Sequence, residues 1–92
     1  MASLVARARV LPADIAVKPE DMLEGLKRSL GSAGRVRSHA VEPIAFGLSA
    51  LLVDIVIEDA EGVTDRLEEA VKKVEGVGQV DILGVSRASV EL

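Results

Sequence analysis

The sequence predicts an α+β fold in which a four-stranded antiparallel sheet carries two helices on one face. Four segments have the alternating apolar side chains of strands, and two segments between them have the three-to-four-residue spacing of helices. Glycine or proline separates most of these segments. Because the chain has 92 residues, of which 49% are hydrophobic, we expect residues 1–92 to form a single domain with one core.

The first half of the chain predicts a strand, a helix and an edge strand. Apolar residues alternate with arginines in residues 3–10, which indicates a half-buried strand. Pro19 suits the first turn of a helix, whose apolar face continues to Leu30 and which Gly31 ends. Basic side chains interrupt residues 35–42, and such charges are typical of an edge strand because they discourage pairing with another chain.

The second half predicts a central strand, a helix and a last strand. Residues 50–57, the interior of the segment 48–58, are apolar on both faces apart from Asp54, as in a strand that has neighbours on both sides. A helix is predicted from about residue 62 to residue 74, and Gly76 follows it. Residues 77–87 form the last strand, in which Gly84 indicates a bulge.

This order of elements is that of the ferredoxin-like arrangement. We expect the first and third strands in the centre of the sheet and both helices on one face. No further element remains to cover the other face. That uncovered face would carry four apolar and four charged side chains, namely Ala50, Leu52, Leu83, Val85, Arg7, Arg9, Asp54 and Asp81.

Composition disfavours several classes of function. The chain has no cysteine and one histidine, so it has no disulfide, thiolate site or recognisable zinc site. Its net charge is −4, which disfavours binding to nucleic-acid phosphates. No apolar run reaches the length of a membrane span, and the first residues do not resemble a signal peptide. We expect a cytoplasmic protein that has no cofactor. We also expect this protein to contact neither nucleic acid nor membrane directly.

No catalytic site can be assembled from this sequence. His39 is the only imidazole and lies on the predicted edge strand, where we expect it to be solvated. The adjacent carboxylates at 58–59 and 68–69 are explained by exposure to solvent. The glycine turns follow helices, whereas a phosphate-binding loop precedes one. We therefore expect a protein that is not an enzyme.

The most informative segment is the connection before the central strand. It contains Phe46, the only aromatic residue of the chain, between Pro43 and Gly47. Large apolar side chains are usually buried, which favours a Phe46 that folds back and fills one end of the core. The alternative is that the connection presents Phe46 to a partner. The spacing alone leaves both interpretations open.

Residues 42–59, EPIAFGLSALLVDIVIED, resemble archaeal elongation factor 1-beta, the counterpart of the exchange domain of the eukaryotic factor. The resemblance covers the whole chain, including VARARVLP at 5–12 and VEGVGQVDILGVSR at 74–87, and PIAFG is its most specific part. It implies a guanine-nucleotide exchange factor that acts without covalent chemistry. The implied partner is elongation factor 1-alpha, the GTPase that delivers aminoacyl-tRNA to the ribosome.

The resemblance also implies two contacts with that GTPase. Arg87 would approach the nucleotide and Mg²⁺, where eukaryotic relatives carry a lysine. Two features depart from that pattern: arginine is planar and bulkier than lysine, and residues 88–92 follow it, with Glu91 adding a negative charge. The other contact would place Phe46 in the partner's second domain, and the implied binding residues are Glu42, Pro43, Ile44, Ala45, Phe46 and Gly47.

A competing hypothesis is a ligand-sensing or oligomerising module of the same fold. Its uncovered sheet face would pair with a second copy of the chain, whereas we expect an exchange factor to be a monomer. The mass measured by size-exclusion chromatography would separate these two hypotheses.

Overall fold

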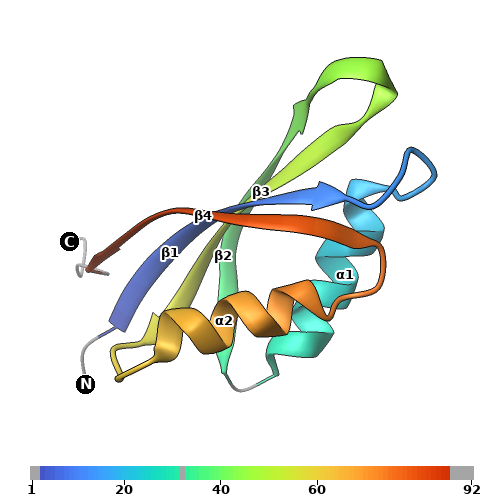
Figure 1. The fold of residues 1–92 in the computed structure, drawn as a ribbon. Helices are drawn as coiled ribbons and strands as arrows, with labels where there is room; N and C mark the ends of the chain where they lie inside the picture. The colour runs from blue at the N-terminus through green and yellow to red at the C-terminus, as the bar shows by residue number, and fades with distance from the viewer. Residues whose placement is uncertain (1–2, 32, 88–92) are drawn as a thin grey trace.

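A computed structural model describes residues 3–31 and 33–87, and it contains every predicted helix and strand (Figure 1). Both ends of each strand lie within two residues of their predicted positions. The α+β, ferredoxin-like fold is therefore confirmed. The elements are β1 (Ser3–Pro12), α1 (Pro19–Leu30), β2 (Gly34–Pro43), the short turn η1 (Ala45–Gly47), β3 (Ser49–Glu58), α2 (Val63–Lys72) and β4 (Val77–Arg87).

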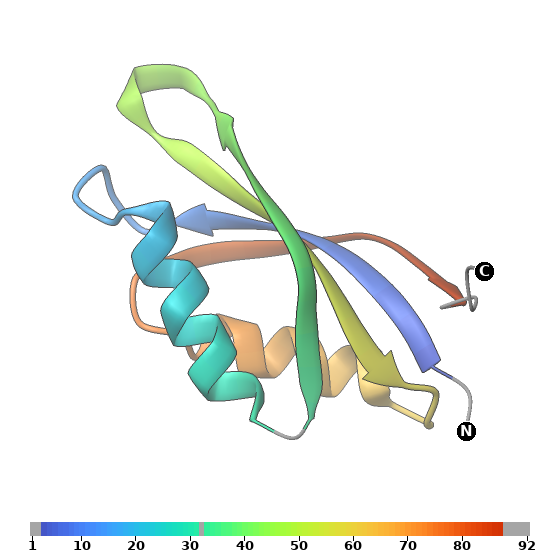
Figure 2. The ribbon, with the colours of Figure 1, turned by 180° about the vertical axis from the view of Figure 1, so that it is seen from behind.

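The four strands form one antiparallel sheet in the order β2-β3-β1-β4. This order confirms that the first and third strands are central and that β2 is an edge strand. Both helices lie on the same face of the sheet, as the two opposite views show (Figures 1 and 2). The other face is left without a covering layer in the described part of the chain.

The core lies between this sheet and the helices. β3 contributes the longest row of buried side chains, at every second residue from Leu51 to Ile57. Gly25 allows α1 to approach the end of α2, because a Cβ atom at this position would lie 2.7 Å from Val74 Cγ1. The largest fully buried side chains are Met22, Leu26, Leu51, Ile55, Val10, Val53 and Val71.

The helix α2 is shorter than the sequence predicts. It ends at Lys72, and the following turn is closed by a 3.1 Å hydrogen bond from the Val74 N–H to the Val71 carbonyl. Val74 stays buried although it lies outside the helix, which explains why the apolar pattern continued to it. Gly76 then reverses the chain with a φ of 92°. Neither α1 nor α2 is long and apolar enough to cross a membrane.

A bulge in β4 changes which face its last residues occupy. Arg7 of β1 is paired with Gly84, and the next residue, Ala8, is paired with Ile82, so Leu83 is the extra residue. The predicted bulge is therefore confirmed. Beyond it, Val85 is paired with Ala6, which belongs to the core on the helix side. The expectation that Val85 lies on the uncovered face is wrong, because one extra residue reverses the alternation of side chains.

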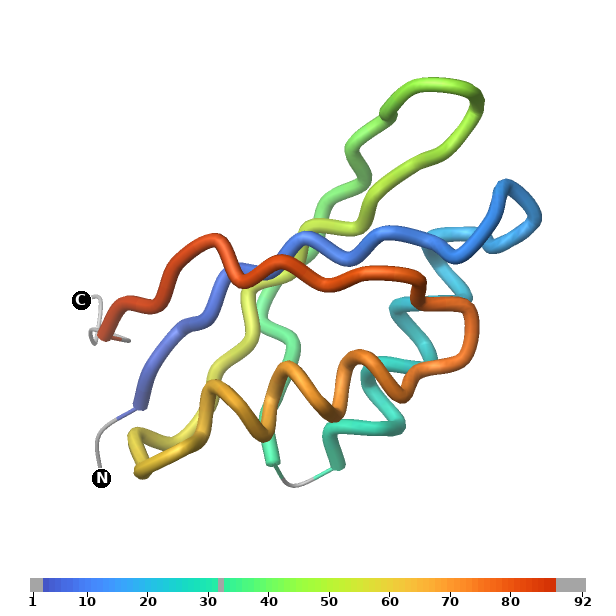
Figure 3. Tube along the Cα trace, viewed as in Figure 1, coloured from blue at the N-terminus to red at the C-terminus, as the bar shows by residue number. Residues whose placement is uncertain are grey.

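The end of the β2–β3 hairpin projects beyond the rest of the sheet. The pairing of β1 with β3 ends at Val10 and Leu51, whereas β2 and β3 stay paired as far as Pro43 and Ser49. Figures 1 and 3 show this hairpin tip at one end of the molecule and the last residues of β4 at the other. The fold thereby places Phe46 and Arg87 at opposite ends.

Candidate functional site

The hairpin tip is a tight turn that exposes its central residue. The Ile44 N–H donates to the Leu48 carbonyl over 2.8 Å, and the Leu48 N–H donates to the Ala45 carbonyl over 3.2 Å. Phe46 and Gly47 both have positive φ angles, 62° and 78°. Positive φ at both central residues is the requirement of a type I′ turn, whose twist matches that of the strands it joins.

Phe46 is strained and exposed at the same time. Its φ of 62° and ψ of 34° lie in the left-handed region, which costs a residue with a side chain about 1 kcal/mol. Asparagine or glycine would fit this position better, and no burial offsets the strain because Phe46 is 90% exposed. The interpretation of Phe46 as a plug of the core is therefore wrong. A strained backbone under an exposed aromatic side chain supports a functional role.

The other predicted residues of the hairpin tip differ in what they contact. Pro43, Ile44, Ala45 and Gly47 are exposed beside Phe46. Glu42, by contrast, is partly buried, and its carboxylate forms a 3.3 Å ion pair with Arg9 Nε across β3. This pair spans the sheet at the level of Ala50, which explains why Ala50 is buried although it lies on the uncovered face. Glu42 thus has a structural contact that the sequence did not indicate.

The β1–α1 loop reaches the same hairpin tip. The side chain of Ile15 in this loop packs against Gly47, since a Cβ atom on Gly47 would lie 2.9 Å from Ile15 Cδ1. Ile15 nevertheless stays 67% exposed. Ile15 was not predicted as a site residue, although an isoleucine in the short loop between Pro12 and Pro19 was a visible signal.

Arg87 lies at the other end of the sheet. It is the last residue of β4, is exposed, and is paired with Leu4 of β1. Leu4 packs against the core from the helix side, so the register places Arg87 on that side. Residues 88–92, whose presence after Arg87 departs from the family pattern, lie outside the described residues. The structure therefore positions Arg87 at a strand end without testing its role.

The two predicted contact points cannot reach the same spot on a partner. Arg87 is opposite Leu4, whereas Phe46 lies beyond the pairing of Val10 with Leu51. At a rise of ~3.3 Å per strand residue, the two residues are roughly 30 Å apart. The longest dimension of the protein is 41 Å. Any partner that contacts both must therefore offer two separate sites.

A buried carboxylate organises the centre of the uncovered face. The side chain of Asp54 is only 9% exposed, and Arg7 donates two hydrogen bonds to it, from Nε over 2.9 Å and from Nη2 over 3.1 Å. Ser38 Oγ donates a third over 3.3 Å, and Arg37 Nη2 lies 3.6 Å away. The hydrogen bonds from Arg7 hold the pKa of Asp54 below its usual range, although burial acts in the opposite direction.

We expect Asp54→Asn to lower the free energy of unfolding at neutral pH by about 1 kcal/mol. This is less than a fully buried hydrogen bond between charged groups contributes, because solvent screens the exposed Arg7. The lowered pKa means that ionised Asp54 stabilises the fold above the pKa of an unfolded aspartate. This stabilisation is lost as the pH falls through the lower pKa of the folded state. The difference between wild type and variant should therefore vanish in acid.

Urea unfolding at about pH 7 and about pH 2 would measure this difference. Asp59→Asn, a substitution at an exposed position, is the matched control and should change little at either pH. A difference for Asp54→Asn that persisted unchanged in acid would show that the ionised carboxylate is not the stabilising group.

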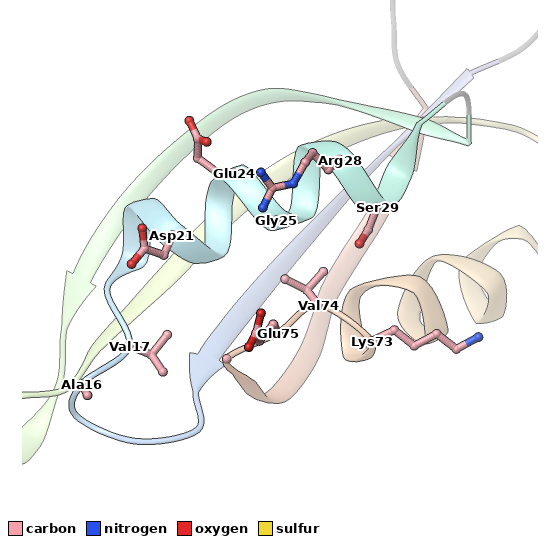
Figure 4. A pocket seen from close by; sticks show the side chains of 11 residues that line it. Ala16, Val17, Asp21, Glu24, Gly25, Arg28, Ser29, Lys73, Val74 and Glu75 are labelled. Atoms are coloured by element: carbon pink, nitrogen blue, oxygen red, sulfur yellow. The ribbon is translucent and has the colours of Figure 1, made fainter.

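A groove lies elsewhere, between α1 and the end of α2 (Figure 4). It has a volume of about 700 Å³, and Gly25 and Val74 form part of its lining. Charges of both signs surround it, from Asp21, Glu24, Arg28, Lys73 and Glu75. None of the predicted site residues lines this groove. Within residues 3–31 and 33–87, no group of histidine and acidic side chains is arranged to hold a metal ion.

Comparison with solved structures supports the fold. The ACT domain from the GTP pyrophosphokinase of Chlorobium tepidum is 17% identical, with a TM-score of 0.60 over 88% of this chain and 99% of that one. The C-terminal domain of the MgtC protein from Mycobacterium tuberculosis is 14% identical, with a TM-score of 0.63 over 92% of this chain and 87% of that one. At these identities the likeness concerns the fold alone.

Comparison of sequences identifies the family. Elongation factor 1-beta of Thermofilum pendens is 41% identical over 97% of this chain and 99% of its own length. The proteins of the same name from Aeropyrum pernix and Archaeoglobus fulgidus are 41% and 39% identical, over 95% and 89% of this chain and 98% and 93% of their own lengths. The family profile described as the EF-1 guanine nucleotide exchange domain matches residues 5–88. The chain therefore belongs to the EF-1 guanine nucleotide exchange domain family, together with archaeal elongation factors 1-beta.

Proposed function

We propose that this protein is a guanine-nucleotide exchange factor that promotes GDP release from elongation factor 1-alpha so that GTP can rebind. Membership of the exchange-domain family supports this activity. The observation that carries it in the structure is Phe46, which is 90% exposed on a turn that strains its backbone. An aromatic side chain held in this way has little use within the isolated fold but suits insertion into a partner.

Exchange requires no covalent step, so the protein does not act as an enzyme. The factor needs only to bind the nucleotide-free GTPase more tightly than the GDP-bound form. Because the coupling between two ligands is reciprocal, it then weakens GDP binding by the same ratio. A rigid sheet with one contact point at each end can act in this way.

The two ends have different proposed roles. The hairpin tip around Phe46 docks on the second domain of elongation factor 1-alpha, and Arg87 acts near the Mg²⁺ and phosphates of its nucleotide-binding domain. A separation of roughly 30 Å between them, from the strand rise and the register, supports contacts with two domains. Docking through the hairpin tip would place Arg87 at one fixed position relative to the nucleotide.

We further propose that the protein works as a monomer in the cytoplasm, without direct contact with nucleic acid or membrane. The uncovered face supports this choice over the oligomerising alternative. Its centre is occupied by Asp54 and its arginines, Ala50 is buried beneath an ion pair, and Val85 is turned to the other face. Of the four apolar residues expected on this face, only Leu52 and Leu83 remain as partly exposed apolar surface for a second copy. Size-exclusion chromatography should therefore give the mass of one chain.

The nucleotide state of the partner tests the exchange function. We expect the tightest binding to nucleotide-free elongation factor 1-alpha, and we expect added Mg²⁺ and GDP to dissociate the complex. Isothermal titration calorimetry with the empty and GDP-bound forms measures the difference. Equal affinity for both forms would contradict the proposal, since a ligand that binds two states equally shifts no equilibrium.

A kinetic experiment complements this measurement. Release of fluorescent GDP from elongation factor 1-alpha should accelerate when this protein is added. The Phe46→Ala variant at the same concentration is the control and should accelerate release much less.

A further inference from the structure

Exposed apolar side chains gather at the hairpin end of the molecule. Within the described residues, four exposed large apolar side chains lie on the hairpin tip, on the adjoining end of β2 or on the neighbouring β1–α1 loop. Two more lie on β4. The exposed large apolar residues are Ile15, Val41, Ile44 and Phe46, and, on β4, Leu83 and Val85. An exposed apolar cluster of this kind marks a site of interaction when it is contiguous.

The β1–α1 loop holds Ile15 in a defined place. The Ala13 N–H donates to the Gly76 carbonyl over 2.8 Å, which fixes the start of the loop. Asp14 closes its turn, because its carboxylate accepts a 2.8 Å hydrogen bond from the Ala16 N–H. Val17 then packs against the core, while Ile15 stays exposed. The loop therefore presents Ile15 from a fixed frame, which limits the entropy lost on binding.

Ile15 and Phe46 belong to one surface because Gly47 joins them. Ile15 Cδ1 lies so close to Gly47 that a Cβ atom there would be only 2.9 Å away. Phe46 is the neighbour of Gly47 in the turn. Ile15 and the turn residues that it meets are uncharged, namely Ile15, Ile44, Ala45, Phe46 and Gly47, and the carboxylate of Asp14 is engaged within its own turn.

We infer that Ile15 is a second apolar anchor, so that the docking surface spans the β1–α1 loop as well as the hairpin tip. This inference rests on the proposed function. The partner of this docking surface is an apolar depression on the elongation factor 1-alpha domain that receives Phe46. The uncharged junction and the continuity with Phe46 support this partner. Two anchors on separate loops fix the direction of docking better than one, because a single side chain allows rotation about itself.

The test is the affinity of Ile15→Ala for nucleotide-free elongation factor 1-alpha. We expect binding to weaken by about tenfold, since the variant loses part of an isoleucine side chain from the interface. Its thermal midpoint should stay close to that of the wild type, because Ile15 is 67% exposed. Leu83→Ala removes an apolar side chain that is 48% exposed on β4 and should bind like the wild type.

A double-mutant cycle with Phe46→Ala distinguishes direct contact from support of the turn. If Ile15 touches the partner, the double variant should bind more weakly than Phe46→Ala alone. If it binds no more weakly, Ile15 acts only by positioning Phe46 and the inference is overturned. If Ile15→Ala bound normally while Phe46→Ala bound weakly, the inference would also be overturned. The docking site around Phe46 would remain. Normal binding of both variants would instead overturn the docking site of the proposed function, and the inference with it.

Discussion

Phe46→Ala is expected to weaken binding to nucleotide-free elongation factor 1-alpha by about thirtyfold, because inserted aromatic anchors often carry ~2 kcal/mol or more. The fold should be unchanged. Phe46 is 90% exposed, so its truncation leaves no cavity in the core. Alanine also keeps the unfavourable positive φ of this position, so the strain of the turn stays similar. Calorimetry for affinity and thermal unfolding for stability measure the two effects separately.

Phe46→Gly is the matched control for the strain. Glycine adopts positive φ without penalty, so this variant should be somewhat more stable than Phe46→Ala while binding equally weakly. A fall in the melting temperature of both variants, with normal affinity of the folded protein, would mean that Phe46 supports the fold instead of docking. Higher stability combined with weaker binding would show that the turn sacrifices stability for a contact with the partner.

The arrangement of strands could be predicted because each strand carries its position in its composition. β3 has buried side chains on both faces, as a strand paired on both sides requires, whereas β2 carries arginines and is largely exposed. Asp54, the buried charged residue of β3, follows a further rule. A carboxylate in a central strand needs a partner, and Arg7 on β1 is directly opposite it.

Features that depend on contacts between distant residues could not be predicted. Gly84 indicated the bulge in β4, but the alternation of side chains alone does not show that the extra residue turns Val85 to the other face. The exposure of Phe46 depends on a hairpin that projects beyond its neighbours. The proximity of Ile15 to Gly47 joins two loops far apart in the chain. The sequence indicated the tip residues, but their conformation follows from the register of the whole sheet.

Arg87→Ala is expected to slow the GDP release that this protein stimulates by more than tenfold, with a much smaller effect on binding to the empty GTPase. A cation placed near bound Mg²⁺ competes with the metal for the phosphates. Two unit charges about 4 Å apart interact by roughly 4 kcal/mol in a partly desolvated cleft. If Arg87→Ala loses half of this energy, GDP release slows by about thirtyfold. Docking through the hairpin tip at the other end of the sheet would remain.

Two further variants identify the active group. Arg87→Lys keeps the charge at the end of β4 and should retain most of the exchange activity, because lysine lacks the planar guanidinium but not the positive charge. Deletion of residues 88–92 tests the segment that follows. If the deletion abolished exchange while Arg87→Ala did not affect it, the active element would be that segment. Fluorescent GDP release measured for all three variants, at concentrations that saturate the GTPase, separates loss of exchange from loss of docking.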